Sequence, residues 1–206
     1  MKGTIPQATV ARLPRYLHCL TDMVDSEAKC SSEQLAIAAG VNSAQVRKDF
    51  SYLGSYGTRG VGYDIRELRS QIRKVLGLTR TYPVVIVGAG NLGSALTNYK
   101  GFDAWGFDVV AVVDIDNDKI GDPVDGLKIE SANRLADIVK ERGIEIGIIA
   151  TPASAAQSVA NRLAEAGVTS ILNLAPTILQ TSDEVFIRRV DLSTELGILA
   201  FHRNSG

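Results

Sequence analysis

The fold is decided by the stretch Val84-Val85-Ile86-Val87-Gly88-Ala89-Gly90-Asn91-Leu92-Gly93, in which a short β-branched run passes into the pattern G-x-G-x-x-G and then into helix-compatible residues. This order predicts a strand, a tight turn and a helix. Gly88 lets the chain turn sharply, Gly90 lets the backbone approach a pyrophosphate, and Gly93 lets the helix pack closely on the strand. Because the helix N-terminus presents unpaired N–H groups to phosphates, we expect cofactor contacts from Gly88, Ala89, Gly90, Asn91, Leu92 and Gly93.

A carboxylate follows this loop at the spacing that dinucleotide-binding folds use. The apolar run from Phe107 to Val113 ends in Asp114, 21 residues past Gly93. In such folds this carboxylate binds the hydroxyl groups of the adenosine ribose, and it would repel the 2′-phosphate of NADP(H). The sequence therefore predicts NAD(H) as the cofactor; a purely structural βαβ turn with a surface Asp is the alternative.

Helices and strands alternate through the rest of this region. We expect helices over 92–100, 131–142 and 154–166, the last capped by Ser154, and strands over 145–150, 169–174 and 185–190. This alternation predicts an α/β Rossmann fold, a doubly wound parallel sheet covered on both faces, with the ligand along the carboxyl ends of the strands. The loop residues expected at that edge are Thr151, Pro152, Asn173 and Pro176.

The net charge of −1 hides a difference between the two parts of the chain. Residues 1–80 hold 12 Lys and Arg against 7 Asp and Glu, a net charge of +5, whereas residues 81–206 hold 10 against 16, a net charge of −6. This division indicates a basic module joined to an acidic one, and a basic module favours a polyanionic partner.

Three short helices are predicted in the basic part. They cover 6–25, 33–39 after a cap at Ser31 or Ser32, and 44–53 after a cap at Ser43, with Gly40 ending the second. Two short helices joined by a turn that contains glycine are typical of a helix-turn-helix, whose second helix lies in the major groove of DNA.

The outer face of the third helix and the glycine-rich segment after it are the expected DNA contacts. If Val46 and Phe50 face the core, then Gln45, Arg47 and Lys48 face outward. Residues 54–63 contain four glycines and a central Arg59, a pattern that suits a β-hairpin wing whose Arg enters a minor groove. The predicted DNA-binding residues are Ser43, Gln45, Arg47, Lys48, Arg59 and Tyr63.

Composition and charge sign change near residue 80, after a predicted helix from Asp64 to Leu76. We therefore expect a winged-helix DNA-binding domain at 1–80, a Rossmann NAD(H)-binding domain at 81–190 and a C-terminal helix at 191–206. Leu192, Leu196 and Leu199 give this last helix an apolar face. Its spacing allows two roles: it completes its own domain, or it packs on a partner chain.

Several functional classes are not indicated. No apolar run reaches the length of a membrane span, and the N-terminus lacks the apolar core of a signal peptide, so we expect a cytoplasmic protein. Cys19 and Cys30 form neither a disulfide framework nor a ligand pattern with His, so we expect no metal, and packing is the expected role of Cys19.

Taken together, these segments resemble the Rex family of redox-sensing transcriptional repressors along essentially the whole chain. The strongest matches are Gln45-Val46-Arg47-Lys48-Asp49-Phe50-Ser51-Tyr52-Leu53-Gly54, Gly57-Thr58-Arg59-Gly60-Val61-Gly62-Tyr63, the loop 88–93, Tyr99-x-Gly101-Phe102 and Asn173-Leu174-Ala175-Pro176. The resemblance implies a homodimer with a domain-swapped C-terminal helix that binds palindromic operator DNA when NADH is scarce and releases it when NADH binds.

The resemblance also implies which residues couple the two ligands. NADH and NAD⁺ share the adenosine half, so discrimination must come from groups near the nicotinamide, and Tyr99 and Asp191 are the candidates. Arg12 is the expected ion partner of Asp191, in a pair that would join the DNA-binding module to the C-terminal helix. The alternative is that Arg12 and Asp191 are solvated surface charges.

Two other functions remain open. A dehydrogenase is the main rival because the same fold often transfers hydride, but His18 and His202 lie far from the predicted strand ends, and no Tyr is followed four residues later by Lys. We therefore expect no catalysis. A nucleotide-binding or CoA-binding module of a larger complex is the third option, and it leaves the helix-turn-helix and the wing unexplained.

Overall fold

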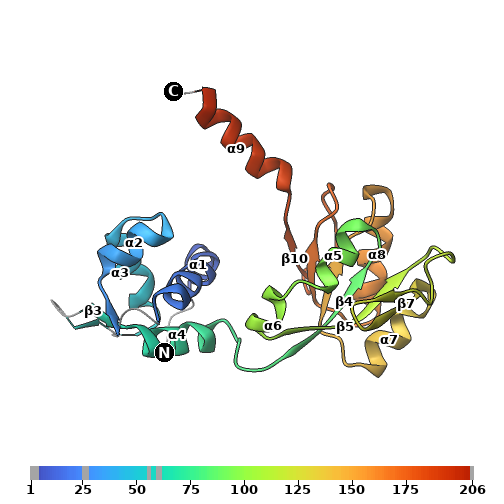
Figure 1. Ribbon diagram of the computed structural model, residues 1–206, viewed down its shortest axis with the longest axis horizontal. Coiled ribbons are helices and arrows are strands. Elements are labelled where there is room, and N and C mark those ends of the chain that lie inside the picture. Colours follow the sequence, from blue (N-terminus) through green and yellow to red (C-terminus); the bar gives the residue numbers. More distant parts are fainter. Residues whose placement is uncertain (1–4, 25–27, 55–56, 59–61, 205–206) are drawn as a thin grey trace. The chain divides into compact units, whose positions relative to one another are not determined.

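The computed structural model describes residues 5–24, 28–54, 57–58 and 62–204. The chain forms two compact units, Met1–Arg80 and Thr81–Gly206 (Figure 1). In the first unit the elements are α1 (Gln7–Met23), β1 (Lys29–Cys30), α2 (Ser32–Ala39), α3 (Ser43–Ser51), β2 (Gly57–Thr58), β3 (Gly62–Asp64) and α4 (Ile65–Val75).

The second unit contains the longer sheet. Its elements are β4 (Tyr82–Val87), α5 (Asn91–Thr97), α6 (Gly101–Trp105), β5 (Phe107–Asp114), β6 (Pro123–Val124), β7 (Leu127–Ser131), the 3-10 turn η1 (Ala132–Arg134), α7 (Leu135–Glu141), β8 (Ile146–Ile149), α8 (Ala153–Glu165), β9 (Ser170–Asn173), β10 (Phe186–Arg189) and α9 (Leu192–Asn204).

Side-chain caps define the helix-turn-helix of the first unit. Ser31 accepts a hydrogen bond from the backbone N–H of Gln34 and begins α2, and Gly40 ends it with the left-handed φ of 63° that glycine adopts without strain. Asn42 then begins α3, because its side-chain oxygen accepts from the Gln45 backbone N–H at 2.8 Å. The predicted cap at Ser43 was therefore wrong by one residue.

A small antiparallel sheet follows, as predicted for a wing. Gly57 pairs with Tyr63, and β1 pairs with the other edge of β3. Gly62 has a φ of 87°, and a Cβ atom there would lie 2.5 Å from the carbonyl oxygen of Cys30, so this strand needs glycine at that point. Arg59, the predicted minor-groove residue, lies outside the described residues.

Aromatic rings tie this sheet to the helices. Phe50 is 2% exposed and packs edge-on against Tyr16 of α1, with ring centroids 5.3 Å apart, and against Tyr63 of β3 at 5.2 Å. The strongly amphipathic α4 completes the core with Ile65, Leu68 and Ile72.

The second unit is a seven-stranded sheet of order β10-β9-β8-β4-β5-β7-β6, in which only β6 pairs antiparallel among the described strands. Alternate residues of the central strand point to opposite faces. Val85 and Val87 pack in a cluster with residues of α7 and α8, whereas Val84 and Ile86 pack in another cluster with Leu96 of α5 and Phe102 of α6. This two-sided burial explains the continuous apolar run in the sequence.

Two local predictions in this unit were wrong. The helix expected over 92–100 ends at Thr97, and a separate short α6 begins at Gly101. The helix expected to be capped by Ser154 begins instead at Ala153, with Pro152 as its N-cap residue and without a side-chain cap.

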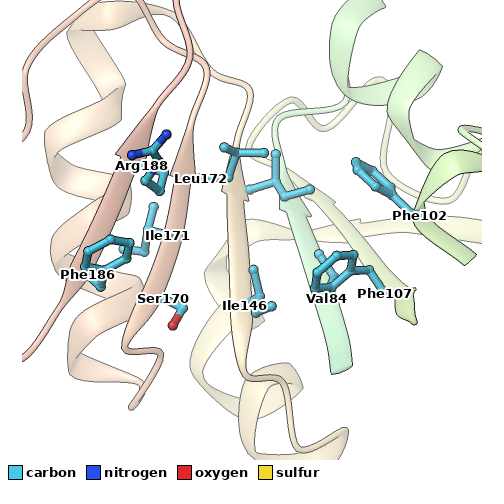
Figure 2. A pocket seen from close by; sticks show the side chains of 10 residues that line it. Val84, Phe102, Phe107, Ile146, Ser170, Ile171, Leu172, Phe186 and Arg188 are labelled. Atoms are coloured by element: carbon cyan, nitrogen blue, oxygen red, sulfur yellow. The ribbon is translucent and has the colours of Figure 1, made fainter. Parts of the chain in front are cut away.

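Part of the sheet carries an open apolar pocket of about 210 Å³. Figure 2 shows its lining side chains along neighbouring strands, with Phe186 and Arg188 at one end and Phe102 at the other. Phe186 is 58% exposed. The apolar side chains of α9 are exposed as well: Leu192, Leu196, Ile198 and Leu199 are 50–67% exposed. One chain therefore leaves two apolar surfaces uncovered.

We predict that Phe50→Ala destabilises the first unit by roughly 3–5 kcal/mol, because it opens a cavity between Tyr16 and Tyr63. Urea unfolding followed by circular dichroism measures this change. The matched control is Ile37→Ala in the same unit, where the side chain is 83% exposed and the change should stay within about 0.5 kcal/mol. Equal midpoints for wild type and Phe50→Ala would contradict the described core.

Candidate functional site

The glycine loop between β4 and α5 is shaped by close packing. Gly88 has a φ of 106°, and a Cβ atom there would lie 2.7 Å from the carbonyl oxygen of Ala150 at the end of β8. A Cβ atom at Gly93 would overlap the Gly88 carbonyl oxygen, so α5 can approach β4 only with glycine there. Gly90 differs, because a Cβ atom there would meet nothing within 4 Å. The space beside Gly90 is thus open to a ligand.

Asp114 at the end of β5 is bonded to this loop. Its carboxylate accepts hydrogen bonds from the backbone N–H groups of Ala89 at 2.7 Å and Asp116 at 2.9 Å, and the Lys119 ammonium lies 3.6 Å away. Burial alone would raise the pKa of Asp114, but these backbone bonds and Lys119 more than offset it, so the pKa lies below its ordinary value. Asp114 is therefore an anion beside the glycine loop, as ribose binding requires.

The loop after β8 brings an unsatisfied hydroxyl to the same edge. Thr151 lies beside Gly88, and its Oγ1 atom is buried without a hydrogen-bond partner in the part of the chain that the structure describes. A buried hydroxyl without a partner is destabilising, so a bound polar group would satisfy it. Pro152 follows and is exposed. Together, the open space at Gly90, the Asp114 anion and the Thr151 hydroxyl fit a dinucleotide.

The other predicted cofactor residues have less direct positions. Asn173 is 1% exposed, accepts from the Ala175 backbone N–H and donates to the carbonyl of Thr177, so it shapes the loop that carries the exposed Pro176. Asn91 and Leu92 are exposed at the start of α5. Tyr99 follows the C-terminal end of α5, which lies about 10 Å along the helix axis from the glycine loop. Its side chain is 57% exposed and packs edge-on against Phe102.

The third helix of the first unit presents two cations. Arg47 and Lys48 are exposed, and the Arg47 guanidinium donates to the hydroxyl of Ser32 at 3.0 Å and lies 3.4 Å from the Glu33 carboxylate. Ser43 is half-buried at the start of the helix. Tyr63 is 9% exposed and its ring belongs to the core, so a contact between Tyr63 and DNA stays a prediction.

A buried carboxylate lies behind these cations, and sequence reasoning missed it. Asp49 of α3 is completely buried and accepts five hydrogen bonds, from Thr9 at 2.9 Å, from Nε and Nη2 of Arg12 at 2.7 Å each, from Tyr16 at 2.8 Å and from Gln45 at 3.0 Å. Thr9, Arg12 and Tyr16 follow helical spacing on α1, and this polar stripe beside apolar positions was the available signal.

Hydrogen bonding decides the charge of Asp49. Burial raises its pKa, but the bonds from Arg12, Tyr16, Thr9 and Gln45 outweigh burial and lower the pKa to about 2. The same environment raises the pKa of Tyr16, first through burial and then through its bond to Asp49. At neutral pH the cluster is therefore an ionised carboxylate with a neutral phenol and a guanidinium.

The predicted coupling residues have partners within their own units. Arg12 binds Asp49, and the Asp191 carboxylate accepts from Arg189 and from the backbone N–H of Ser193 at 3.1 Å. Those bonds to Ser193 and Arg189 lower the pKa of Asp191. An Arg12–Asp191 pair stays a prediction.

The described residues contain no group of three or more His, Cys, Asp or Glu side chains that could hold a metal ion. No helix among them is long and apolar enough to cross a membrane. Cys30 is buried, and the pKa of the partly buried Cys19 thiol is raised, mainly by burial.

Comparisons with known proteins match two separate parts of the chain to two families. Residues 4–51 match a family described as "Putative DNA-binding protein N-terminus", and residues 79–177 match one described as "CoA binding domain". The redox-sensing transcriptional repressor Rex of Streptomyces coelicolor is 59% identical over 199 residues, which cover 96% of this chain and 77% of that protein. The Rex of Carboxydothermus hydrogenoformans is 48% identical over 204 residues, or 98% of each chain.

Solved structures of a Rex-family repressor also superpose on this chain. RSP, a Rex-family repressor, superposes with a TM-score of 0.91 and 33% identity in its crystal structure with β-NAD⁺ and operator DNA, where the match covers 98% of this chain and 94% of RSP. Its crystal structure with β-NADH superposes with a TM-score of 0.90 and the same identity, over 98% and 95% of the two chains.

We predict that Gly90→Ala weakens NADH binding at least tenfold while the free energy of unfolding changes by less than about 1 kcal/mol. A Cβ atom there meets nothing within 4 Å, so the added methyl group should leave the fold intact and occupy the space in which we expect the pyrophosphate. Calorimetric titration and thermal unfolding measure the two quantities. Gly197→Ala on α9, where a Cβ atom also meets nothing within 4 Å, is the control. Unchanged NADH affinity in Gly90→Ala would remove the loop from the site.

Proposed function

This chain belongs to the Rex family of redox-sensing transcriptional repressors, and from that premise we propose that it represses transcription as a homodimer whose operator binding depends on NAD(H). The observation that carries the proposal is the joining, in one chain, of an exposed cationic recognition helix and a glycine loop backed by the Asp114 anion. RSP, its relative, is known in complexes with β-NAD⁺ and operator DNA and with β-NADH.

The cofactor end of the proposal rests on four features. The N-terminus of α5 and the open space at Gly90 receive the pyrophosphate, Asp114 receives the adenosine ribose, and the Thr151 hydroxyl donates to or accepts from the bound dinucleotide. NADH and NAD⁺ differ only at the nicotinamide ring, so these groups supply affinity. The discrimination between the two forms we assign to Tyr99 and Asp191, with Arg12 as the ion partner of Asp191.

The DNA end rests on α3 and the wing. Arg47 and Lys48 contact phosphates and base edges in the major groove, with Ser43 and Gln45 beside them, and Arg59 enters the minor groove. Because a two-fold symmetric dimer presents two such helices, the operator is palindromic. A regulator of this kind acts where the chromosome is, so we also propose a cytoplasmic location.

The dimer is favoured by the apolar surfaces that one chain leaves uncovered. The exposed Leu192, Leu196 and Leu199 of α9, and the pocket beside Phe186 (Figure 2), become buried when α9 packs on a second chain. In this arrangement the C-terminal helix is domain-swapped: it packs on the partner chain instead of completing its own domain. It also gives each cofactor site a neighbour in the other subunit through which binding can change the dimer.

The chain is a regulator and not an enzyme, since its relatives at 59% and 48% identity are named transcriptional repressors. The alternative function, a CoA-binding module of a larger complex, is supported only by the description of the family that residues 79–177 match. It does not explain the separate match of residues 4–51 to a DNA-binding N-terminus.

We predict that Arg47→Ala and Lys48→Ala each weaken operator binding by about 1–3 kcal/mol and reduce the slope of log affinity against log salt by about 1. Fluorescence anisotropy at several salt concentrations measures both. Lys140→Ala, an exposed cation of α7 in the other unit, is the control and should bind as wild type does. Folded Arg47 and Lys48 variants with wild-type affinity would show that α3 does not read DNA.

We predict that Asp114→Asn reduces the preference for NADH over NADPH at least tenfold, because the neutral amide no longer repels a 2′-phosphate and Lys119 lies close enough to attract one. Asn is chosen because one oxygen still accepts from the Ala89 N–H that holds the loop. Calorimetry with both cofactors gives the ratio, and Asp116→Asn is the neighbouring control. An unchanged ratio in Asp114→Asn would remove Asp114 from the ribose site.

A further inference from the structure

The Asp49 cluster joins the recognition helix to the first helix of the chain. Four of the five hydrogen bonds to its carboxylate come from α1, through Thr9, Arg12 and Tyr16, and the fifth comes from Gln45, one turn earlier on α3. All five are between 2.7 and 3.0 Å, so both oxygens are saturated. A buried carboxylate that loses part of this set is strongly destabilised, which holds the two helices in one arrangement.

Stability alone does not require a charge at this position. Apolar groups of similar volume commonly stabilise a core as well as a buried ion pair does. Hydrogen bonds differ from apolar contacts because they are directional, and they fix the rotation of α3 about its axis, whereas Val46 and Phe50 alone would tolerate small rotations. Rotating a helix by 20° moves a side chain at its surface by roughly 2 Å, which breaks a hydrogen bond to a base.

The cluster also orients the Gln45 amide. An ionised carboxylate can only accept hydrogen bonds, so Gln45 must turn its NH₂ group toward Asp49, with Nε2 3.0 Å from Oδ1. The amide keeps its carbonyl oxygen and one N–H for another partner. Glutamine uses such an acceptor and donor pair on the edge of adenine.

We propose that Asp49 is a positioning residue for operator recognition: it holds α3 on α1 in one rotation and turns the Gln45 amide to read the edge of an adenine. This inference rests on the proposed function. Asp49 does not touch DNA, because it is completely buried, and it acts through Gln45, Arg47 and Lys48, which lie within one turn of it.

Graded variants test the proposal. Asp49→Asn keeps the shape but loses the charge and one acceptor, and Thr9→Val removes one hydrogen bond at constant shape. Thr21→Val is the matched control on the same helix, because the Thr21 hydroxyl donates to the Leu17 carbonyl within α1 and has no bond to Asp49. The probes are the palindromic duplex that the wild-type chain selects from a random library with NAD⁺ present, and a scrambled duplex of the same length.

The measurement is the ratio of affinities for the selected and scrambled duplexes at one salt concentration, with folding checked by circular dichroism. Asp49→Asn should reduce this ratio about tenfold, Thr9→Val about threefold and Thr21→Val not at all. Purely structural damage lowers the affinity for both duplexes by the same factor and leaves the ratio unchanged, which would overturn the proposal. If Asp49→Asn does not fold, Thr9→Val and Tyr16→Phe decide the question, since each removes a single donor.

A double-mutant cycle tests the role of Gln45. Gln45→Leu should lower the ratio in the wild-type background and have little further effect in the Asp49→Asn or Thr9→Val background, because Gln45 is then already misplaced. Replacing adenines of the selected duplex one at a time should show one position whose effect disappears in Gln45→Leu. Additive effects of the two substitutions, or no such position, would contradict the proposal. A wild-type chain that selects no duplex would instead refute the proposed function itself.

Discussion

A carboxylate removed from water must be saturated with hydrogen-bond donors, and each unit of this protein is arranged around one such group. In the first unit Asp49 binds α1 to the recognition helix, and in the second Asp114 binds the end of β5 to the glycine loop. Both groups keep their charge because donors outweigh the effect of burial on their pKa. Each holds a segment that we propose to face a polyanionic ligand: α3, for the phosphates of DNA, and the glycine loop, for a pyrophosphate.

Control of one ligand by the other needs a dimer with two arrangements. Moving such an equilibrium from 1:99 to 99:1 takes about 5.5 kcal/mol of differential binding, whereas an exposed ion pair contributes at most about 1 kcal/mol. A pair between Arg12 and Asp191 could therefore form in only one of the two arrangements, but it could not provide the free energy that shifts the dimer between them. In the dimer that we propose, burial of the apolar residues of α9 and of the pocket on the sheet adds a further favourable contribution.

The sequence predicted the features that depend on the spacing of apolar residues and on the positions of glycines. The parallel sheet, the helix-turn-helix, the loop from Gly88 to Gly93 and the position of Asp114 follow from local patterns, and the Rex family follows from their combination. The caps were predicted at Ser43 and Ser154, whereas the structure has them at Asn42 and Pro152. Several neighbouring residues can begin a helix, and the sequence pattern does not distinguish them. Asp49 was missed because its partners lie 33 to 40 residues earlier on α1, and only the packed helices bring them together.

The link between the two ligands is the central claim, and one titration tests it most directly. The complex of the wild-type chain with its selected palindromic duplex is formed in NAD⁺ and followed by fluorescence anisotropy while NADH, and in parallel more NAD⁺, is added. The account predicts that NADH releases the duplex at concentrations that saturate the glycine-loop site and that NAD⁺ does not. A duplex that stays bound when calorimetry shows the site filled with NADH would contradict it.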